Sequence, residues 1–171
     1  MRRYFIDYSL KNGLGNPAIS LYLTGCDNPI KCEDCHNWEL QEQSKYDYDI
    51  DKIKNEIDKE IYNYLQFHSK LYTAILGGEP LAEYNKDITL QISKYIKEKY
   101  PNSTTILYSW RTIEQINNEN LRSYISYIDY GVLGVYNKNL HIENTLPAST
   151  NQYIYDFINN KKLASIKLKK G

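Results

Sequence analysis

Apolar side chains along the chain repeat at two spacings, one typical of strands and one typical of helices. Residues 4–8 and 18–23 are rich in aromatic, β-branched and alternating apolar side chains, which predicts two early strands. The segment between them, residues 11–17, contains two glycines and a proline and is expected to be a loop without regular structure. Isoleucine and leucine then recur at steps of three and four over residues 50–65, which predicts a helix that begins near Asp49.

The middle of the chain continues the alternation of strand and helix patterns. Residues 71–76 are almost entirely apolar, as expected of a strand buried on both faces of a parallel sheet. Apolar positions from Ile88 to Ile96 predict a second helix, which must end by Tyr100 because Pro101 cannot continue it.

Two further strands and a third helix are expected in the second half of the chain. Residues 104–108 and 130–135 have strand patterns, and Thr112 followed three residues later by Gln115 resembles a capping box at a helix start. This alternation favours an α/β fold with right-handed crossovers. We therefore expect one domain over residues 1–171, a partial (β/α) barrel of about five or six mostly parallel strands with functional groups at their carboxyl ends.

Composition and charge narrow the functional classes. Hydrophobic residues make up 42% and charged residues 25% of the chain, which excludes a disordered or fibrous protein. Lys plus Arg and Asp plus Glu both number 21, and this neutral balance argues against a nucleic-acid partner. No apolar run approaches the roughly 20 residues needed to cross a bilayer, and residues 1–3 lead into a Tyr-rich segment instead of a signal core. A cytoplasmic protein without a membrane partner is expected.

The three cysteines lie close together in the sequence and none remains elsewhere to pair with them. Cys26, Cys32 and Cys35 form a C-x5-C-x2-C loop that follows a predicted strand, a pattern that points to metal or cluster ligation and away from disulfides. Three thiolates suit a 4Fe-4S cluster with one open iron. The alternative is a structural zinc site completed by His36 or another side chain, and the place of His36 directly after Cys35 makes it a poor fourth ligand.

A second motif, Gly77-Gly78-Glu79-Pro80, follows the predicted buried strand. The two glycines would let a ligand approach the backbone, Glu79 offers a carboxylate to an ammonium group, and Pro80 stiffens the turn. The alternative is a tight strand-to-helix turn in which Glu79 is a solvated acid. Because the cysteine loop follows an earlier strand of the same predicted sheet, the two motifs together are far more specific than either alone.

Together these motifs resemble the radical S-adenosylmethionine (SAM) superfamily, and more narrowly the activating enzymes of anaerobic ribonucleoside-triphosphate reductases, a group of glycyl-radical activases. Residues 12–26 are similar to the glycine-rich approach to the first cluster cysteine in that group, and residues 35–37 resemble the Cys-His-Asn that closes its cluster loop. Residues 149–152 resemble its Ser-Ser-Asn-Gln segment. The resemblance covers nearly the whole chain.

The resemblance implies a cofactor site. Cys26, Cys32 and Cys35 would act as the catalytic cluster ligands of a 4Fe-4S cluster whose open iron binds SAM. It implies further SAM contacts from Asp34, His36, Asn37, Gly77, Gly78, Glu79, Pro80 and Ser109. Arg111 is read either as a contact for the SAM carboxylate or as a solvated side chain. The chain departs from the group in having five residues instead of three between its first two cysteines, and in having Asp34 where the group has an apolar or aromatic residue over the adenine.

The resemblance also implies a reaction and partners. The reduced cluster would pass one electron to SAM, and the resulting 5′-deoxyadenosyl radical would take a hydrogen atom from a glycine of a large glycyl-radical enzyme, an anaerobic ribonucleotide reductase. A flavodoxin- or ferredoxin-type protein would donate the electron. Two alternatives stay open: a radical SAM enzyme acting on another protein, peptide or small molecule, and a non-catalytic zinc-binding interaction module.

Overall fold

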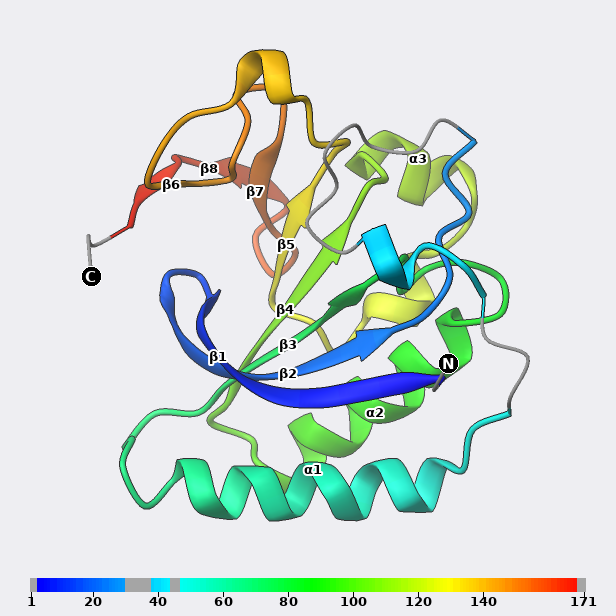
Figure 1. Cartoon of the computed structure of the whole chain (residues 1–171), viewed down its shortest axis with the longest axis vertical. Coiled ribbons are helices and arrows are strands. Elements are labelled where there is room, and N and C mark those ends of the chain that lie inside the picture. The colour runs from blue at the N-terminus through cyan, green and yellow to red at the C-terminus, as the bar shows by residue number, and fades with distance from the viewer. Residues whose placement is uncertain (1–2, 30–37, 44–46, 169–171) are drawn as a thin grey trace.

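The centre of the molecule is a seven-stranded sheet of order β1-β2-β3-β4-β5-β7-β8, as seen in a computed structural model that describes residues 3–29, 38–43 and 47–168 (Figure 1). Its strands are β1 (Tyr4–Gly13), β2 (Asn16–Leu23), β3 (Tyr72–Gly77), β4 (Thr104–Ser109), β5 (Tyr130–Leu133), β7 (Tyr153–Asp156) and β8 (Lys161–Leu163). A second, two-stranded sheet consists of β6 (Thr145–Leu146) and β9 (Ile166–Lys167).

The helices are α1 (Ile50–Tyr64), α2 (Lys86–Lys99) and α3 (Ile113–Asn118), with three short 3-10 turns, η1 (Trp38–Leu40), η2 (Arg122–Ile125) and η3 (Lys138–Leu140). The expected start of α1 is confirmed, because the Asp49 side chain caps it by accepting hydrogen bonds from the amides of Asp51 and Lys52. The capping box of Thr112 and Gln115 also forms at the start of α3. Across the three described ranges, no helix has the length and apolar character needed to span a membrane.

The predicted partial barrel of mostly parallel strands is wrong. Strands β2 to β5 are parallel to one another, but β1, β7 and β8 each pair antiparallel with their neighbours, so the sheet is mixed. For β1 the reason lies in its connection to β2. Parallel neighbours need a long crossover, whereas β1 and β2 are joined by a tight turn at Leu14 and Gly15, both with positive φ. The expected loop over residues 11–17 is therefore mostly strand.

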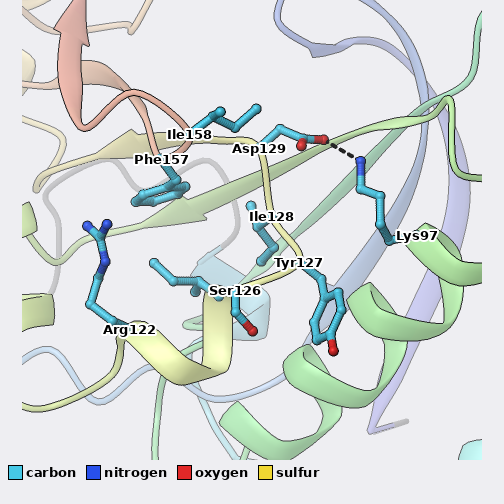
Figure 2. Close-up of a pocket in the computed structure, with 9 residues that line it drawn as sticks. Lys97, Arg122, Ser126, Tyr127, Ile128, Asp129, Phe157 and Ile158 are labelled. Carbon is cyan, nitrogen blue, oxygen red and sulfur yellow. Dashed lines mark hydrogen bonds and ion pairs between the residues drawn. The ribbon is translucent and has the colours of Figure 1, made fainter.

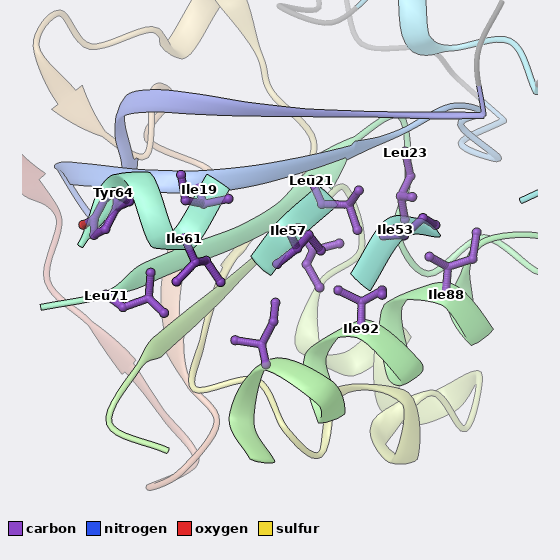
Figure 3. Close-up of a cluster of buried hydrophobic side chains, with 12 residues drawn as sticks. Ile19, Leu21, Leu23, Ile53, Ile57, Ile61, Tyr64, Leu71, Ile88 and Ile92 are labelled. Carbon is purple, nitrogen blue, oxygen red and sulfur yellow. The ribbon is translucent and has the colours of Figure 1, made fainter. Parts of the chain in front are cut away.

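One face of the sheet carries the helices. Leu21, Ile75 and Leu107 are register partners on adjacent strands and so share a face. Leu21 and Ile75 pack with buried isoleucines of α1 and α2 in one core cluster (Figure 3), and Leu107 packs with α3 and η2 in a second. Burial of these two apolar clusters is the main contribution to the stability of the sheet, and it thereby fixes the positions of the strand ends.

The opposite face of the parallel strands has a different character. Ser20 and Tyr22 of β2 point to it, as does Tyr108 of β4. Asn12 ties them together, because its side-chain amide donates to the hydroxyls of Ser20 at 3.0 Å and Tyr22 at 3.1 Å, while Tyr108 donates to its carbonyl oxygen at 2.9 Å. None of the described α-helices packs on this face. At the carboxyl ends of the strands it borders the site described below.

Candidate functional site

The carboxyl ends of the four parallel strands meet at one edge of the sheet and enclose a cavity of about 140 Å³. This is the edge at which open parallel sheets bind ligands. Most of its lining comes from residues that end or follow these strands: Cys26, Leu76 to Gly78, Tyr108 to Trp110, Val132, Gly134 and Tyr136. Gln41, which follows η1, and Gln152, which precedes β7, complete it. Cys26 and the Gly77-Gly78 turn therefore lie at the edge where the sequence predicted functional groups.

Cys26 is half-buried and lines this cavity. The backbone around it is held by η1 and the residues after it, since the amide of Gly25 donates to Leu40 at 2.7 Å and that of Cys26 donates to Gln41 at 2.8 Å. A thiol on the wall of a cavity at the strand ends is suitably placed to ligate a group bound there.

The Gly77-Gly78 turn lies directly against the segment that carries Cys26. Gly77 has a φ of +117°, and a Cβ at Gly78 would lie 2.1 Å from the carbonyl oxygen of Gly25, so a larger residue at Gly78 would force the backbone apart. The amide of Gly78 donates to Leu23 at 2.8 Å. The glycines thus serve two purposes: they allow two backbones to touch, and they line the cavity.

Glu79 is completely buried behind the cavity wall. Its Oε2 accepts hydrogen bonds from the Leu81 amide at 3.0 Å and from the Ser109 hydroxyl at 2.8 Å, and its Oε1 accepts from the Trp110 amide at 3.0 Å. Burial raises the pKa of this carboxyl to about 7, against the opposing effect of the Arg111 guanidinium 3.3 Å away. The alternative of a solvated acid is therefore wrong.

Arg111 is the least expected feature of the site. Its side chain is only 5% exposed, so the solvated alternative is wrong for it too. Its guanidinium contacts three carboxylates from separate parts of the chain: Asp27 beside Cys26, Glu79 after β3, and Glu119 at the end of α3. Although burial acts in the other direction, hydrogen bonds from Arg111 and Trp110 hold the pKa of Asp27 below its ordinary value.

Two other predicted residues are placed close to Glu79. Ser109 is nearly buried, and its hydroxyl donates to Glu79 while accepting from the Arg111 amide at 3.1 Å. Pro80 is buried, and its carbonyl oxygen accepts from the Thr89 hydroxyl of α2 at 2.8 Å. Both residues fix the glycine turn, and Ser109 also lines the cavity.

The structure brings together part of the predicted site. Cys26, Gly77, Gly78 and Ser109 share one cavity, with Glu79 and Pro80 behind it. Cys32, Asp34, Cys35, His36 and Asn37 lie outside the described residues. Within residues 3–29, 38–43 and 47–168, no cluster of three or more Cys, His, Asp or Glu side chains is arranged to hold a metal ion. The described residues fit a cluster bound through Cys26 beside a ligand on the glycine turn.

Asp27 and the buried role of Arg111 were not predicted from the sequence. The position of Asp27, directly after the predicted cluster ligand Cys26, was the available signal, but its partners Trp110 and Arg111 follow β4, far away in the sequence. A charged residue in a loop is usually solvated, and only the fold shows that these two meet.

A second cavity, of about 450 Å³, lies at the opposite edge of the sheet and is separate from this site (Figure 2). Asp129 there accepts a hydrogen bond from Lys97 at 2.8 Å and one from the Thr105 amide at 2.9 Å. Arg122 lies over the ring of Phe157. The contacts of Asp129 connect α2 to the starts of β4 and β5, and the contact of Arg122 connects η2 to the residue after β7. They provide matched control positions for the site.

Comparison with known proteins supports an iron-sulfur site. Residues 11–155 match a family model described as a 4Fe-4S single cluster domain. Over 150 residues the chain is 27% identical to the anaerobic ribonucleoside-triphosphate reductase-activating protein of Enterobacteria phage T4, which covers 84% of this chain and 86% of the phage protein. No solved structure matches the chain. The predicted resemblance to this group of activases is confirmed.

Proposed function

The chain belongs to the 4Fe-4S single cluster domain family, and on that basis we propose that it is a radical SAM activase that generates a glycyl radical on a partner anaerobic ribonucleotide reductase. The observation that carries the proposal is the shared cavity of Cys26 and the Gly77-Gly78 turn, formed by segments that hydrogen bond directly to each other. A cluster ligand and a ligand-binding turn would then act on the same bound molecule.

In this proposal the three cysteines hold the cluster, Cys26 from the described wall of the cavity and Cys32 and Cys35 from the rest of the loop. When bound, the cluster supplies the electron that cleaves SAM. The backbone of Gly77 and Gly78 lines the cavity and would form hydrogen bonds with the amino acid end of SAM. Asp34, His36 and Asn37 remain proposed contacts on the cysteine loop.

Glu79 has a more specific part in this scheme than a direct contact with the ligand. Both of its oxygens already accept hydrogen bonds from the protein, so it would have to give up a donor to reach an ammonium group. We propose that it mainly holds Ser109 and the glycine turn in place, with Ser109 presenting the polar group next to the cavity. Pro80 has the same supporting role.

The remaining lining suits radical chemistry. Leu76 and Val132 supply apolar wall, and burial raises the pKa of Tyr108, whose hydroxyl therefore stays protonated and donates to Asn12. A lining of this kind keeps water away from a reactive intermediate. The sheet face below the cavity lacks a covering α-helix among the described residues, which suits a macromolecular substrate that covers the site itself.

The test of the partner is direct. The protein, reconstituted anaerobically with iron and sulfide, is mixed with a reductant, SAM and the anaerobic ribonucleoside-triphosphate reductase from the same source. The proposal predicts a glycyl-radical signal in electron paramagnetic resonance (EPR) spectra, present with the wild-type protein and absent when the three cysteines are replaced by alanine. SAM cleavage without that signal would point to another protein, peptide or small-molecule substrate. Binding of zinc alone, without a cluster, would favour the interaction module.

A further inference from the structure

We propose that Arg111 is a positioning residue of the cofactor site: its guanidinium holds Asp27, next to Cys26, against Glu79 of the glycine turn, and thereby fixes the cysteine-bearing segment relative to the strand ends. The geometry stands on its own, while its consequence for catalysis rests on the proposed function. Arg111 is the second residue after β4, and its backbone amide donates to the hydroxyl of Ser109, the last residue of that strand, at 3.1 Å.

The contacts of Arg111 use its whole guanidinium. Nη1 donates to Asp27 Oδ1 at 3.0 Å and Nη2 donates to Asp27 Oδ2 at 2.5 Å, a bidentate pair. Nη1 also lies 3.3 Å from Glu79 Oε2, while Nε and Nη2 donate to Glu119 at 3.0 and 3.2 Å. A lysine has three donors on a single nitrogen and cannot bridge three carboxylates in this way.

The neighbouring residue reinforces the same contact. The indole Nε1 of Trp110 donates to Asp27 Oδ1 at 3.0 Å, and the backbone amide of Trp110 donates to Glu79 Oε1 at 3.0 Å. Two consecutive residues after β4 therefore each touch both Asp27 and Glu79. This duplication connects the segment after β2 to the turn after β3 through side chains, in addition to the backbone contact at Gly25.

Anchoring at Asp27 matters because of the spacing of the cysteines. Five residues separate Cys26 from Cys32, and Asp27 is the first of them. The entropy cost of closing a loop grows with the number of residues in it. An anchor at Asp27 fixes the first residue of this span, and together with the hydrogen bond from the Cys26 amide to Gln41 it holds the backbone at Cys26.

Conservative variants test this inference without removing the fold. Arg111→Lys keeps the charge, and Asp27→Asn keeps the shape of a side chain that is 29% exposed. Matched controls at the opposite edge of the sheet are Arg122→Lys and Asp129→Asn. Each protein is reconstituted with iron and sulfide, and two quantities are measured: the rate at which a chelator removes iron, and the dissociation constant of SAM from the change it causes in the EPR spectrum of the reduced cluster.

We expect Arg111→Lys and Asp27→Asn each to accelerate iron loss and to weaken SAM binding by about tenfold or more, as is typical when a residue supporting a metal ligand is changed. The double variant should be no worse than the worse single variant, because both changes break one interaction. The controls should stay within about twofold of the wild type.

Iron loss at the wild-type rate in both site variants would overturn the inference. A second result would also overturn it. If a control variant with the same loss of melting temperature lost iron as fast as the site variants, the effect would come from lower stability, and Arg111 would have only a structural role. If the wild type holds a cluster but releases no 5′-deoxyadenosine, the proposed function fails, while the iron-loss comparison still decides the role of Arg111. A wild-type protein that takes up no cluster overturns both.

Discussion

The backbone amide of Glu79 donates a hydrogen bond of 2.7 Å to the carbonyl oxygen of Gly25. This contact joins the turn after β3 to the segment that carries Cys26, so the two motifs of the sequence meet through their backbones and not only across a cavity. The precise approach depends on glycine at position 78, and the orientation of the turn depends on the buried carboxylate of Glu79.

Replacement of Gly78 by alanine should disrupt this contact. The new Cβ would lie 2.1 Å from a backbone oxygen that cannot move aside independently. We expect the free energy of unfolding, measured with urea, to fall by about 3 kcal/mol, at the upper end of the cost of overpacking. Gly15→Ala is the control: that residue has positive φ, but its Cβ would meet side chains and no backbone, Leu168 at 3.3 Å and Ile166 at 3.9 Å, and a loss of about 1 kcal/mol is expected. Equal losses would contradict the account.

The carboxyl of Glu79 should make stability depend on pH. Its pKa is raised from 4.5 to about 7 in the folded protein, so between these values the folded state binds more protons than the unfolded state. This group therefore favours folding at low pH, and its contribution is lost as the pH rises from about 4.5 to above 7.

Glu79→Gln isolates that contribution, because glutamine does not titrate. We expect the variant to be less stable than the wild type at acidic pH, since its NH₂ group would face donors only. The difference in free energy of unfolding between the two proteins should shrink from pH 4.5 to pH 8. A difference that grows over this range would mean that the Arg111 guanidinium lowers the pKa of Glu79 by more than burial raises it.

Ser109→Ala removes a donor to Glu79 and an acceptor for the Arg111 amide. Leaving buried polar groups unsatisfied should reduce the free energy of unfolding by about 1–3 kcal/mol, as measured by urea unfolding. The proposed function adds a second effect, an increase in the KM for SAM. The same loss of stability with an unchanged KM would assign Ser109 a structural role only.

The ion pair of Lys97 and Asp129 provides a contrasting case. It connects the end of α2 to the start of β5, and Lys97 also donates to the Ser103 carbonyl oxygen at 2.7 Å. Lys97→Met should lower the free energy of unfolding by about 1–3 kcal/mol, because the Asp129 carboxylate loses a partly buried partner. Cluster content and SAM cleavage per folded molecule should be unchanged, since this pair lies at the edge of the sheet away from the cavity. Reduced cluster content would contradict the separation of the two cavities.

Local patterns predicted the helices well and the sheet poorly. The period of the isoleucines and the cap at Asp49 located α1 because both signals are local. The direction of a strand depends instead on its connection, and a turn of Leu14 and Gly15 with positive φ is enough to reverse the chain. Strand β7, Tyr153–Asp156, is only four residues long and went unassigned.

For the candidate site, too, the features set by strand direction and local motifs were predicted and the long-range contacts were not. The convergence of Cys26 and the glycine turn was predictable, because both follow parallel strands whose carboxyl ends share one edge of the sheet. The burial of Glu79 was not found, because its donors come from the end of β4. The Asp27–Arg111 pair was not found for the same reason: two charged residues far apart in the sequence give no sign that they meet.

Release of 5′-deoxyadenosine from SAM tests the central claim most directly. The protein is purified without oxygen, reconstituted with iron and sulfide, reduced, and incubated with SAM, alongside a variant with Cys26, Cys32 and Cys35 replaced by alanine. The account predicts 5′-deoxyadenosine from the wild type and none from the variant. A wild-type protein that carries a well-formed cluster, yet releases no 5′-deoxyadenosine even with the reductase present, would contradict it.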